Sequence, residues 1–506
     1  MNLALMELGT ALHSISDGVT ESLDAADATS TGVDTVMGRE VAGSAHGESA
    51  LSPTEIAVSS VTELSNCADA TTSLDWTVVR RLRRMAIEII TQRDAAWVAE
   101  HDTPMPIIDR RLLGRSAIRT AVRNHIEHQA QAGEPVWSLE TEQAYSTTIE
   151  NAIFGFGRLQ PLFELPEAEN VEIHGCEVVF VQAGDGTRTT LPSVADDDGE
   201  LVEAIRFLGQ TADPPRPFDD AHPVMTLALG DRFRLHAIGF GLSDRPSIAI
   251  RQHLLTEVTL TELATRGMLS VQLAKLLEAA VKARLSIVIS GDQGAGKTTL
   301  LRALIAAIPA TERFGTLETD YELLTHLRTP RPNVVALQAR VGLGELQSGR
   351  NVGEYTVTDL IPEALRQNLT RLVVGEVRGA EAGAMFEAMQ SGAGTMSTTH
   401  SHSAAGTIDR LAARVAQGGV VGVLEAYRQI AHHLGLIVHV RLDDNTWRGG
   451  RRVRYVDEVV ELTGGLENER PVTHLLYQKN ADTAEQFTAS RQLLDELARY
   501  RDEVEL

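Results

Sequence analysis

A glycine-rich segment in the middle of the chain constrains the fold more than any other feature. Residues 291–298 read Gly-Asp-Gln-Gly-Ala-Gly-Lys-Thr and fit the pattern G-x-x-x-x-G-K-[ST]. The apolar run LSIVIS precedes this segment, and TLLRALIAAI, which has helical periodicity, follows it. A strand, a tight loop and a helix in this order predict a parallel α/β sheet with the loop at its carboxyl edge.

The residue types of this loop suit phosphate binding. Glycines let backbone N–H groups wrap around an anion, and the helix N-terminus adds its dipole. Lys297 can reach the β and γ oxygens of a nucleotide, and Thr298 can bind Mg²⁺. The alternative is a glycine-rich turn without a ligand. We therefore expect ATP and Mg²⁺ as cofactors, with these nucleotide-binding residues: Gly291, Asp292, Gln293, Gly294, Ala295, Gly296, Lys297, Thr298 and Thr299.

A carboxylate follows a second buried-strand pattern. The run Arg371-Leu372-Val373-Val374-Gly375 leads directly to Glu376, at the end of a predicted strand where ligands bind in such sheets. A carboxylate there can hold the metal or orient an attacking water. An apolar run that ends in glutamate is common by itself, so the prediction depends on the phosphate loop. Glu376 is our candidate for catalysis and, with Thr298, for metal binding.

The chain is too long for one ordinary domain. Its first 74 residues are acidic, contain one basic residue, Arg39, and show no hydrophobic period, which is typical of disorder. Strands and helices alternate from about residue 261, starting with one helix over 261–283. We predict a disordered extension, a helical module, an α+β domain, a P-loop domain and a C-terminal helix over residues 1–74, 75–142, 143–256, 257–480 and 481–506.

The region before the P-loop domain contains two kinds of pattern. Apolar residues recur at helical spacing over 76–100, 110–130 and 138–154, and short strand-like runs follow, such as VEIHGCEVVFVQ and SIAIRQHL. The first helix carries a run of arginines that can meet lipid headgroups or a partner, although such runs are usually a solvated helix face. These arginines are Arg80, Arg81, Arg83 and Arg84.

Charge and cysteine content narrow the possible partners. The net charge is −23, which opposes nonspecific attraction to nucleic acid or anionic lipid. The two cysteines, Cys67 and Cys176, cannot build a disulfide framework or a four-cysteine zinc site. No apolar run approaches the roughly 20 residues that span a bilayer, and the N-terminus lacks the basic start of a signal peptide. We therefore expect a cytoplasmic protein.

Further motifs resemble the type II/IV secretion ATPase family over about residues 143–480. Residues 318–323, Glu-Thr-Asp-Tyr-Glu-Leu, resemble its acidic box, with Thr319 in place of the usual second acid. Residues 377–382 resemble its arginine signature around Arg378, and residues 397–400, Ser-Thr-Thr-His, resemble its histidine box. The absence of a four-cysteine module argues against the type II secretion and pilin-polymerising branch. The helical module and the sequence of residues 365–400 look more like the tight-adherence (Flp/Tad) pilus and type IV secretion traffic branch.

The resemblance implies roles for further residues. It assigns Glu318 and Glu322 to Mg²⁺ and water, His400 to the γ-phosphate, and Arg378 to the catalytic set, whereas the role of Asp320 stays open. Arg234 and Arg251 would swing onto the phosphates as arginine fingers do. His402 forms a His-x-His pair with His400 but lacks a second ligand cluster, and His432 and His433 are expected to be helix residues without a site.

The resemblance also implies an architecture and a function. The fold would be a RecA-like P-loop NTPase with a doubly wound parallel sheet, preceded by a smaller α+β domain and a helical module. The protein would be a hexameric, ATP-hydrolysing motor for pilus assembly or secretion, bound to a platform protein at the cytoplasmic face of the membrane.

Two rival functions remain. A DNA-translocating conjugation motor should have a basic channel, which the charge disfavours, so we expect no direct nucleic-acid binding. A nucleotide-switched scaffold with little turnover is kept open by the altered acidic box.

Overall fold

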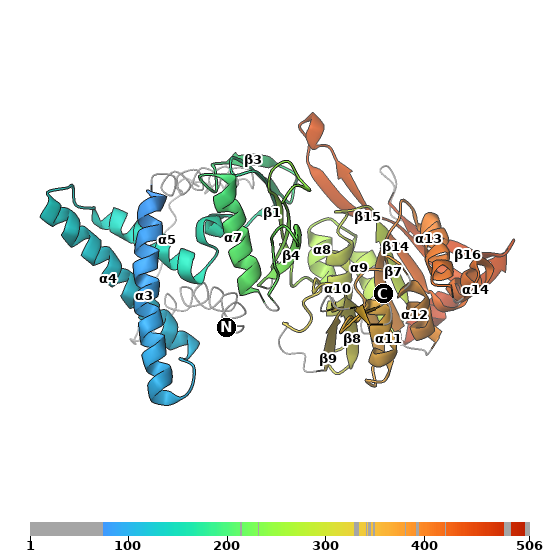
Figure 1. Ribbon diagram of the computed structural model, residues 1–506. Coiled ribbons are helices and arrows are strands. Elements are labelled where there is room, and N and C mark those ends of the chain that lie inside the picture. Colours follow the sequence, from blue (N-terminus) through green and yellow to red (C-terminus); the bar gives the residue numbers. More distant parts are fainter. Residues whose placement is uncertain are drawn as a thin grey trace, which may run out of the picture. The chain divides into compact units, whose positions relative to one another are not determined.

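The computed structural model describes residues 74–500, except for short gaps at 213–214, 231, 328–332, 341, 343–345, 348–349, 380, 391–393, 420 and 480–486. The predicted acidic extension, apart from Leu74, therefore lies outside the described residues. The chain divides into two compact units (Figure 1). The first contains the described residues up to Ala183 and Arg188–Gln252, and the second contains Gly184–Thr187 and the described residues from His253 onward.

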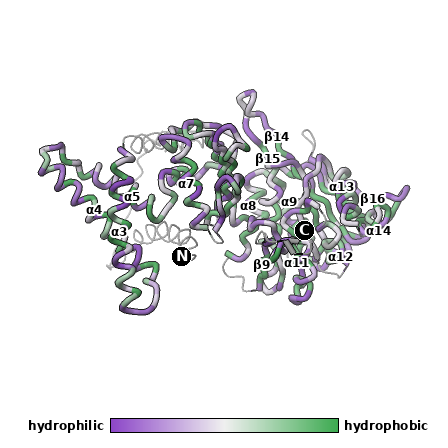
Figure 2. Tube along the Cα trace, in the orientation of Figure 1, coloured by the Kyte–Doolittle hydropathy of each residue, from purple (hydrophilic) through white to green (hydrophobic). Residues whose placement is uncertain are grey.

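Three helices begin the first unit and confirm the predicted helical segments. They are α3 (Trp76–His101), α4 (Ile107–Ala132) and α5 (Leu139–Phe154). Asp75 caps α3 by accepting from the backbone N–H of Thr77, and Asp102 ends it with a φ of 53°. Apolar residues at helical spacing along α3 and α4, including Leu82 and Ile118, form a core between the helices. Figure 2 shows hydrophilic stretches between the hydrophobic ones along both helices.

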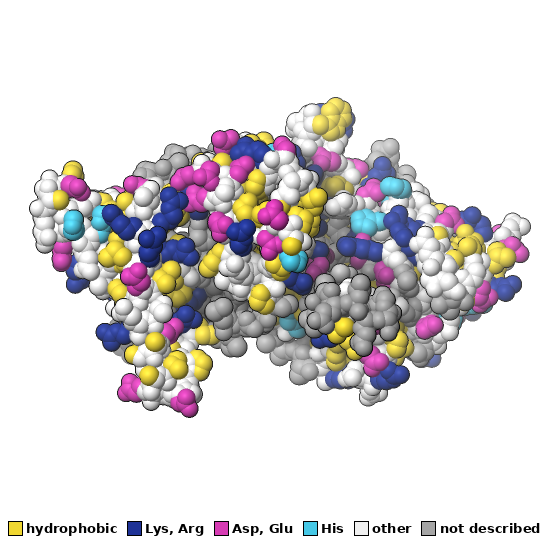
Figure 3. All heavy atoms as spheres, viewed as in Figure 1, with side chains coloured by type: hydrophobic (Ala, Val, Ile, Leu, Met, Phe, Trp, Pro, Cys, Tyr) yellow, Lys and Arg dark blue, Asp and Glu magenta, His cyan; other side chains and the backbone are white. Residues whose placement is uncertain are grey.

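The arginine run of α3 takes part largely in local contacts. Arg80 pairs with Glu200 at 3.2 Å, Arg81 Nη2 lies 3.2 Å from His125 Nδ1, and the Arg83 guanidinium lies 5.6 Å from the ring centre of Phe207. Arg84 is exposed. Figure 3 shows arginine side chains gathered on one face of the first unit. Three of the four arginines therefore have packing or pairing partners within the unit.

The rest of the first unit is a six-stranded antiparallel sheet with helix α7 (Asp198–Thr211). Its strand order is β3-β2-β1-β6-β5-β4. One core joins Leu201, Ile205 and Leu208 of α7 to alternate residues of the strands, such as Leu235 and Ile250. The remaining elements are η1 (Gly157–Leu159), α6 (Gln160–Phe163), β1 (Ala168–His174), β2 (Val178–Ala183), β3 (Arg188–Leu191), β4 (Val224–Leu229), β5 (Phe233–Ile238) and β6 (Ser247–Gln252).

Strand β4 is the element of this sheet that the sequence patterns did not predict. It pairs with β5 along its whole length, from Val224 opposite Ile238 to Leu229 opposite Phe233. The pairing places β4 at the edge of the sheet, beside β5, whose sequence FRLHAIGFG does have a strand-like pattern.

The second unit is built on an eight-stranded sheet whose order is β16-β15-β14-β7-β13-β12-β8-β9. The strands from β14 to β9 are parallel, as the alternation of strands and helices predicts. β15 and β16 pair antiparallel at one side, because hairpin turns rather than helical crossovers connect them. The strands are β7 (Ile287–Gly291), β8 (Phe314–Glu318), β9 (Val334–Gln338), β12 (Arg371–Val374), β13 (Gly394–His400), β14 (Leu436–Asp444), β15 (Arg452–Glu467) and β16 (Arg470–Gln478).

Helices cover both faces of this sheet, as a doubly wound fold requires. Ile287 and Ile289 of β7 join the core under α8, α9 and α10, whereas Val288 between them joins the core under α11 to α14. The helices are α8 (Leu260–Thr265), α9 (Val271–Lys282), α10 (Lys297–Ala306), α11 (Val357–Leu365), α12 (Glu381–Gln390), α13 (Ala404–Gln417), α14 (Val423–His433) and α15 (Arg491–Leu497). Short elements complete the unit: β10 (Leu346–Gln347), β11 (Arg350–Asn351), η2 (Thr446–Arg448) and η3 (Ala498–Tyr500).

Two predicted helices of this unit differ from the structure. The single helix predicted over 261–283 is wrong, because the segment forms two helices. α8 ends before Gly267, which has a φ of 78°, and Ser270 caps α9 by accepting from the backbone N–H of Leu273. Hydrophobic periodicity continues across the break, so the pattern alone did not reveal it. Of the helix predicted over 481–506, the described residues contain α15 and the short η3.

Hydrophobicity along the helices bears on membrane insertion. Among the helices described by the structure, none has the length and hydrophobicity needed to cross a bilayer.

Candidate functional site

The phosphate loop lies between β7 and α10, as the sequence predicts. Gly294 and Gly296 have φ values of 75° and 93°, which side chains disfavour. A Cβ on Gly291 would lie 2.2 Å from the carbonyl oxygen of Val440, so the neighbouring strand leaves no room for one. The three glycines therefore set the shape of the loop, and the N-terminus of α10 points into it.

Lys297 is buried at the start of α10, with 7% of its surface exposed. Its Nζ donates to the carbonyl oxygens of Gly291 (3.1 Å) and Asp292 (2.9 Å). His400 Nδ1 lies 3.3 Å from the same ammonium. Strand pairing explains the proximity, because β13 places His400 opposite Gly291. The structure thus brings the predicted phosphate-binding lysine and the predicted histidine together.

Glu376 lies between a histidine and an arginine. Its Oε1 is 3.0 Å from His400 Nε2, although no hydrogen bond is aligned between these atoms, and its Oε2 accepts from Arg378 Nη2 at 2.5 Å. Burial raises the pKa of Glu376, but the hydrogen bond and charge of Arg378, together with the charges of His400 and Lys297, leave that pKa below its usual value. Burial and the charge of Lys297 lower the pKa of His400. The site therefore holds an ionised carboxylate beside a neutral imidazole.

The surroundings of Glu318 shift its pKa in the direction opposite to that of Glu376. It is 3% exposed, and its Oε1 accepts from the backbone N–H groups of Glu322 (2.9 Å) and Leu323 (2.7 Å). Its Oε2 is buried and has no hydrogen-bond partner among the described residues. Burial raises the pKa of Glu318 to about 7. A Cβ on Gly375 would lie 3.1 Å from Glu318 Cγ, so the residue before Glu376 must be small for both carboxyls to occupy this edge.

The acidic box lies near Arg378. Besides the bond to Glu376, the charges of Glu322 and Asp320 raise the pKa of Arg378. Asp320, the acid displaced by one position, thus contributes to the same electrostatic field as Glu322. The structure brings the acidic box, the arginine signature and the histidine box to one edge of the sheet.

The sequence did not predict what the two threonines of the histidine box do. Thr398 Oγ1 donates to the carbonyl oxygen of Gly375 (2.7 Å), and Thr399 Oγ1 donates to that of Val377 (3.1 Å). Both threonines are buried, and they hold the residues on either side of Glu376. The Ser-Thr-Thr-His run was a signal for this role, because buried hydroxyls need partners.

Arg302 is a second residue that the sequence interpretation missed. It is 2% exposed on α10, and its guanidinium donates to the carbonyl oxygens of Leu255 (2.8 Å) and Glu322 (3.0 Å from Nε). It therefore connects the phosphate-loop helix to the acidic box. An arginine within the otherwise apolar run TLLRALIAAI was the available signal.

Arg234 and Arg251 lie in the first unit, whereas the phosphate loop lies in the second. They are directly opposite each other on β5 and β6. Their strand neighbours Leu235 and Ile250 belong to the core of the unit, so the two arginines extend from the other face of the sheet.

The donor set suits Mg²⁺ that arrives with phosphates. Within the described ranges, no three His, Cys, Asp or Glu side chains are grouped so as to hold a metal ion. Thr298 and the ionised Glu376 supply hard oxygen ligands, and Mg²⁺ is usually held by one or two protein groups plus phosphates and waters.

The other histidines that the sequence analysis considered show no contacts that indicate a binding site. His402 contacts Asp292 at 2.8 Å, but with 91% of its side chain exposed this pair contributes little. His432 and His433 are the last two residues of α14, so they are helix residues, as expected.

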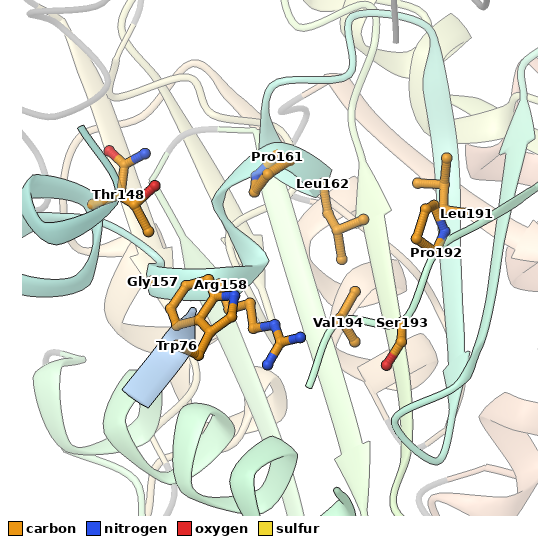
Figure 4. Close-up of a pocket in the computed structure, with 11 residues that line it drawn as sticks. Trp76, Thr148, Gly157, Arg158, Pro161, Leu162, Leu191, Pro192, Ser193 and Val194 are labelled. Atoms are coloured by element: carbon orange, nitrogen blue, oxygen red, sulfur yellow. The ribbon is translucent and has the colours of Figure 1, made fainter. Parts of the chain in front are cut away.

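A cavity of about 90 Å³ lies within the first unit (Figure 4). Figure 4 shows Trp76 and Arg158 side by side in its lining, with the guanidinium 4.8 Å from the ring centre. Arg158 Nη1 also bonds Asp196 (2.8 Å) and Glu200 (3.0 Å). The positive charge is thus already compensated, so the cavity is not a second phosphate site.

Comparisons with known proteins find a matching family model and several similar proteins. A family model described as "Type II/IV secretion system protein" matches residues 225–505. "Putative conjugal transfer protein Rv3659c" of Mycobacterium tuberculosis is 32% identical over 310 residues, covering 60% of this chain and 84% of that protein. "Type IV secretion system protein PtlH" of Bordetella pertussis is 38% identical over 136 residues, covering 27% of this chain and 38% of that protein. The crystal structure of the VirB11 ATPase of Brucella suis is 24% identical, with a TM-score of 0.31, and covers 61% of this chain and 96% of that one.

Proposed function

The chain belongs to the type II/IV secretion system protein family, and on that premise we propose that it is a Mg²⁺-dependent ATPase that powers pilus assembly or secretion. One observation carries the proposal. Four predicted site residues from segments far apart in the chain lie at the carboxyl ends of the neighbouring strands β7, β13, β12 and β8. This is where an α/β sheet binds its ligand. The four residues are Lys297, His400, Glu376 and Glu318.

Each of these residues has its own role in phosphoryl transfer. The loop amides and Lys297 bind the phosphates, and Thr298 with Glu376 would hold Mg²⁺, which would neutralise charge on the phosphates. The ionised Glu376 orients the attacking water, while neutral His400 lies beside Lys297 and can donate toward the terminal phosphate. Glu318 and Glu322 of the acidic box would help to hold the metal and the attacking water. Complete Lys297, Thr298 and Glu376 favour turnover over a scaffold that only binds nucleotide.

Two substitutions separate binding from chemistry. Lys297→Ala should abolish ATP binding and hydrolysis, because it removes the charge that holds the phosphates. Glu376→Gln should retain ATP binding but lower kcat at least about 100-fold, because the amide cannot take the role of the carboxylate. Equilibrium binding of ATP and release of phosphate measure the two effects.

Matched surface variants control this experiment. Lys479→Ala changes an exposed lysine beside Tyr455, and Glu387→Gln changes an exposed glutamate on α12. Both should behave like the wild type. Wild-type turnover in Glu376→Gln would show that a different acid, such as Glu318, carries the reaction.

The cellular task that ATP hydrolysis powers is the second part of the proposal. The family and the name of the PtlH relative support secretion, and we propose a homo-hexameric ring that binds a platform protein at the cytoplasmic face of the membrane. The name of the mycobacterial relative supports the alternative of a DNA-translocating conjugation motor. The charge of −23 opposes direct contact with DNA. Salt-dependent DNA binding by the purified protein would favour the alternative.

A further inference from the structure

An arginine on β15 contacts the phosphate loop. Arg454 Nε donates to the carbonyl oxygen of Gly294 at 2.7 Å. A Cβ on Gly296 would lie 3.6 Å from Arg454 Cδ, so the side chain also passes along the last glycine of the loop. Arg454 is half-buried and is 160 residues from Gly294 in the sequence. Its Nη1 donates to the carbonyl oxygen of Gly184 at 2.8 Å, which helps to fix the guanidinium.

The bond to Gly294 fixes a peptide plane in the loop. In a trans peptide the carbonyl of one residue and the N–H of the next point in opposite directions. By holding the carbonyl of Gly294, Arg454 orients the N–H of Ala295, which donates to the carbonyl oxygen of Asp292 at 3.3 Å. Glycines such as Gly294 can adopt many other conformations. A loop that is held in one conformation loses less entropy when it binds an anion.

We propose that Arg454 is a positioning residue that preorganises the phosphate loop for nucleotide binding. The inference rests on the proposed function, because it concerns the same loop. It differs from the role of Lys297, since Arg454 binds the loop through a carbonyl and need not touch the phosphates. Its guanidinium also adds positive charge beside the loop, which favours an anion there.

Other arginines near the same hairpin serve as comparisons. Arg452 Nε bonds Asp444 at 2.7 Å. Arg448 Nη2 donates to Asn445 at 2.6 Å, and its guanidinium lies 5.5 Å from the ring centre of Trp447. Arg448 is six positions from Arg454 in the sequence, and these contacts lie in the turn before β15. Replacing it therefore controls for the loss of an arginine from this hairpin.

The test uses the full chain, with MgADP as the probe of binding and ATP for turnover. Arg454→Ala should weaken MgADP binding and raise the KM for ATP about tenfold, which equals about 1.4 kcal/mol, while kcat changes less than about twofold. Arg454→Lys should fall between the wild type and Arg454→Ala, because it keeps the charge without the planar donor group. Arg448→Ala should match the wild type.

Several results would overturn the inference. One is wild-type affinity for MgADP in both Arg454 variants, and another is a lower kcat with unchanged affinity and KM. A purely structural role would lower the unfolding midpoint without changing the affinity of the folded protein. If Arg454→Ala does not fold, Arg454→Lys still decides the question. If the wild type itself does not bind MgADP, the proposed function fails, and the inference fails with it.

Discussion

Two carboxyls of the site have pKa shifts of opposite sign, and their surroundings explain this. Arg378 keeps the pKa of Glu376 below its usual value, whereas burial raises the pKa of Glu318 to about 7. Carboxyls whose environments separate their pKa values can take different roles in one reaction. Glu376 suits metal and water as an anion, while Glu318 can bind or release a proton near neutral pH.

The raised pKa of Glu318 predicts a pH dependence of stability. Its ordinary value is 4.5, so the folded state binds the proton more tightly than the unfolded state does. Protonation of Glu318 therefore contributes fully to the unfolding free energy below pH 4.5, and this contribution is lost as the pH rises through about 7. Relative to Glu318→Gln, the wild type should therefore lose up to about 3 kcal/mol of unfolding free energy over this range. Urea unfolding in EDTA at several pH values measures this.

Glu387→Gln is the matched control for that experiment, because it makes the same substitution at an exposed position of α12. Its stability should follow the wild type across the same pH range. Parallel curves for the wild type and Glu318→Gln would show that Glu318 does not titrate as its burial implies. The sequence predicted Glu318 as a site residue, but not its pKa, because burial depends on long-range packing against Gly375.

At the scale of elements, the sequence predicted most helices and strands but not every connection. The strand–loop–helix around the phosphate loop and the three N-terminal helices are confirmed, because their periodicity and caps are local signals. β4 was missed, since its pattern is weak without its partner β5. The break at Gly267 was missed because both helices bury apolar faces in the same core. Both features depend on contacts between distant segments, which a local sequence pattern does not contain.

Arg302 leads to a prediction at the same scale, since it connects α10 to the acidic box. Arg302→Ala should lower the unfolding free energy by about 2–4 kcal/mol, because it removes a buried side chain and its hydrogen bonds to the half-buried carbonyl oxygens of Leu255 and Glu322. It should also lower kcat, because the acidic box loses its support. Denaturant unfolding and ATPase assays measure the two effects. Arg266→Ala, at an exposed arginine after α8, should change neither; equal stability of both variants would contradict the prediction.

At the scale of the whole molecule, the proposed catalytic residues are divided between the two units. The second unit holds the phosphate loop and the acidic residues, and the first holds Arg234 and Arg251. Arg234 and Arg251 are directly opposite each other on neighbouring strands, so the oxygens of one phosphate group can bond both guanidinium groups. Because the arginines and the loop belong to separate units, we propose that a domain closure brings them together during each cycle.

This closure predicts how the arginine variants behave. Arg234→Ala and Arg251→Ala should each lower kcat at least about tenfold while changing ATP affinity less than about threefold, because the contact stabilises charge that develops in the transition state. Arg188→Ala, at an exposed arginine paired with Glu172 in the same sheet, is the control and should retain activity. Sedimentation of Glu376→Gln with MgATP should show a hexamer, since bound nucleotide would hold the closed units in a ring. Unchanged kcat in both arginine variants, or a monomer at every protein concentration tested, would exclude this coupling between hydrolysis and movement.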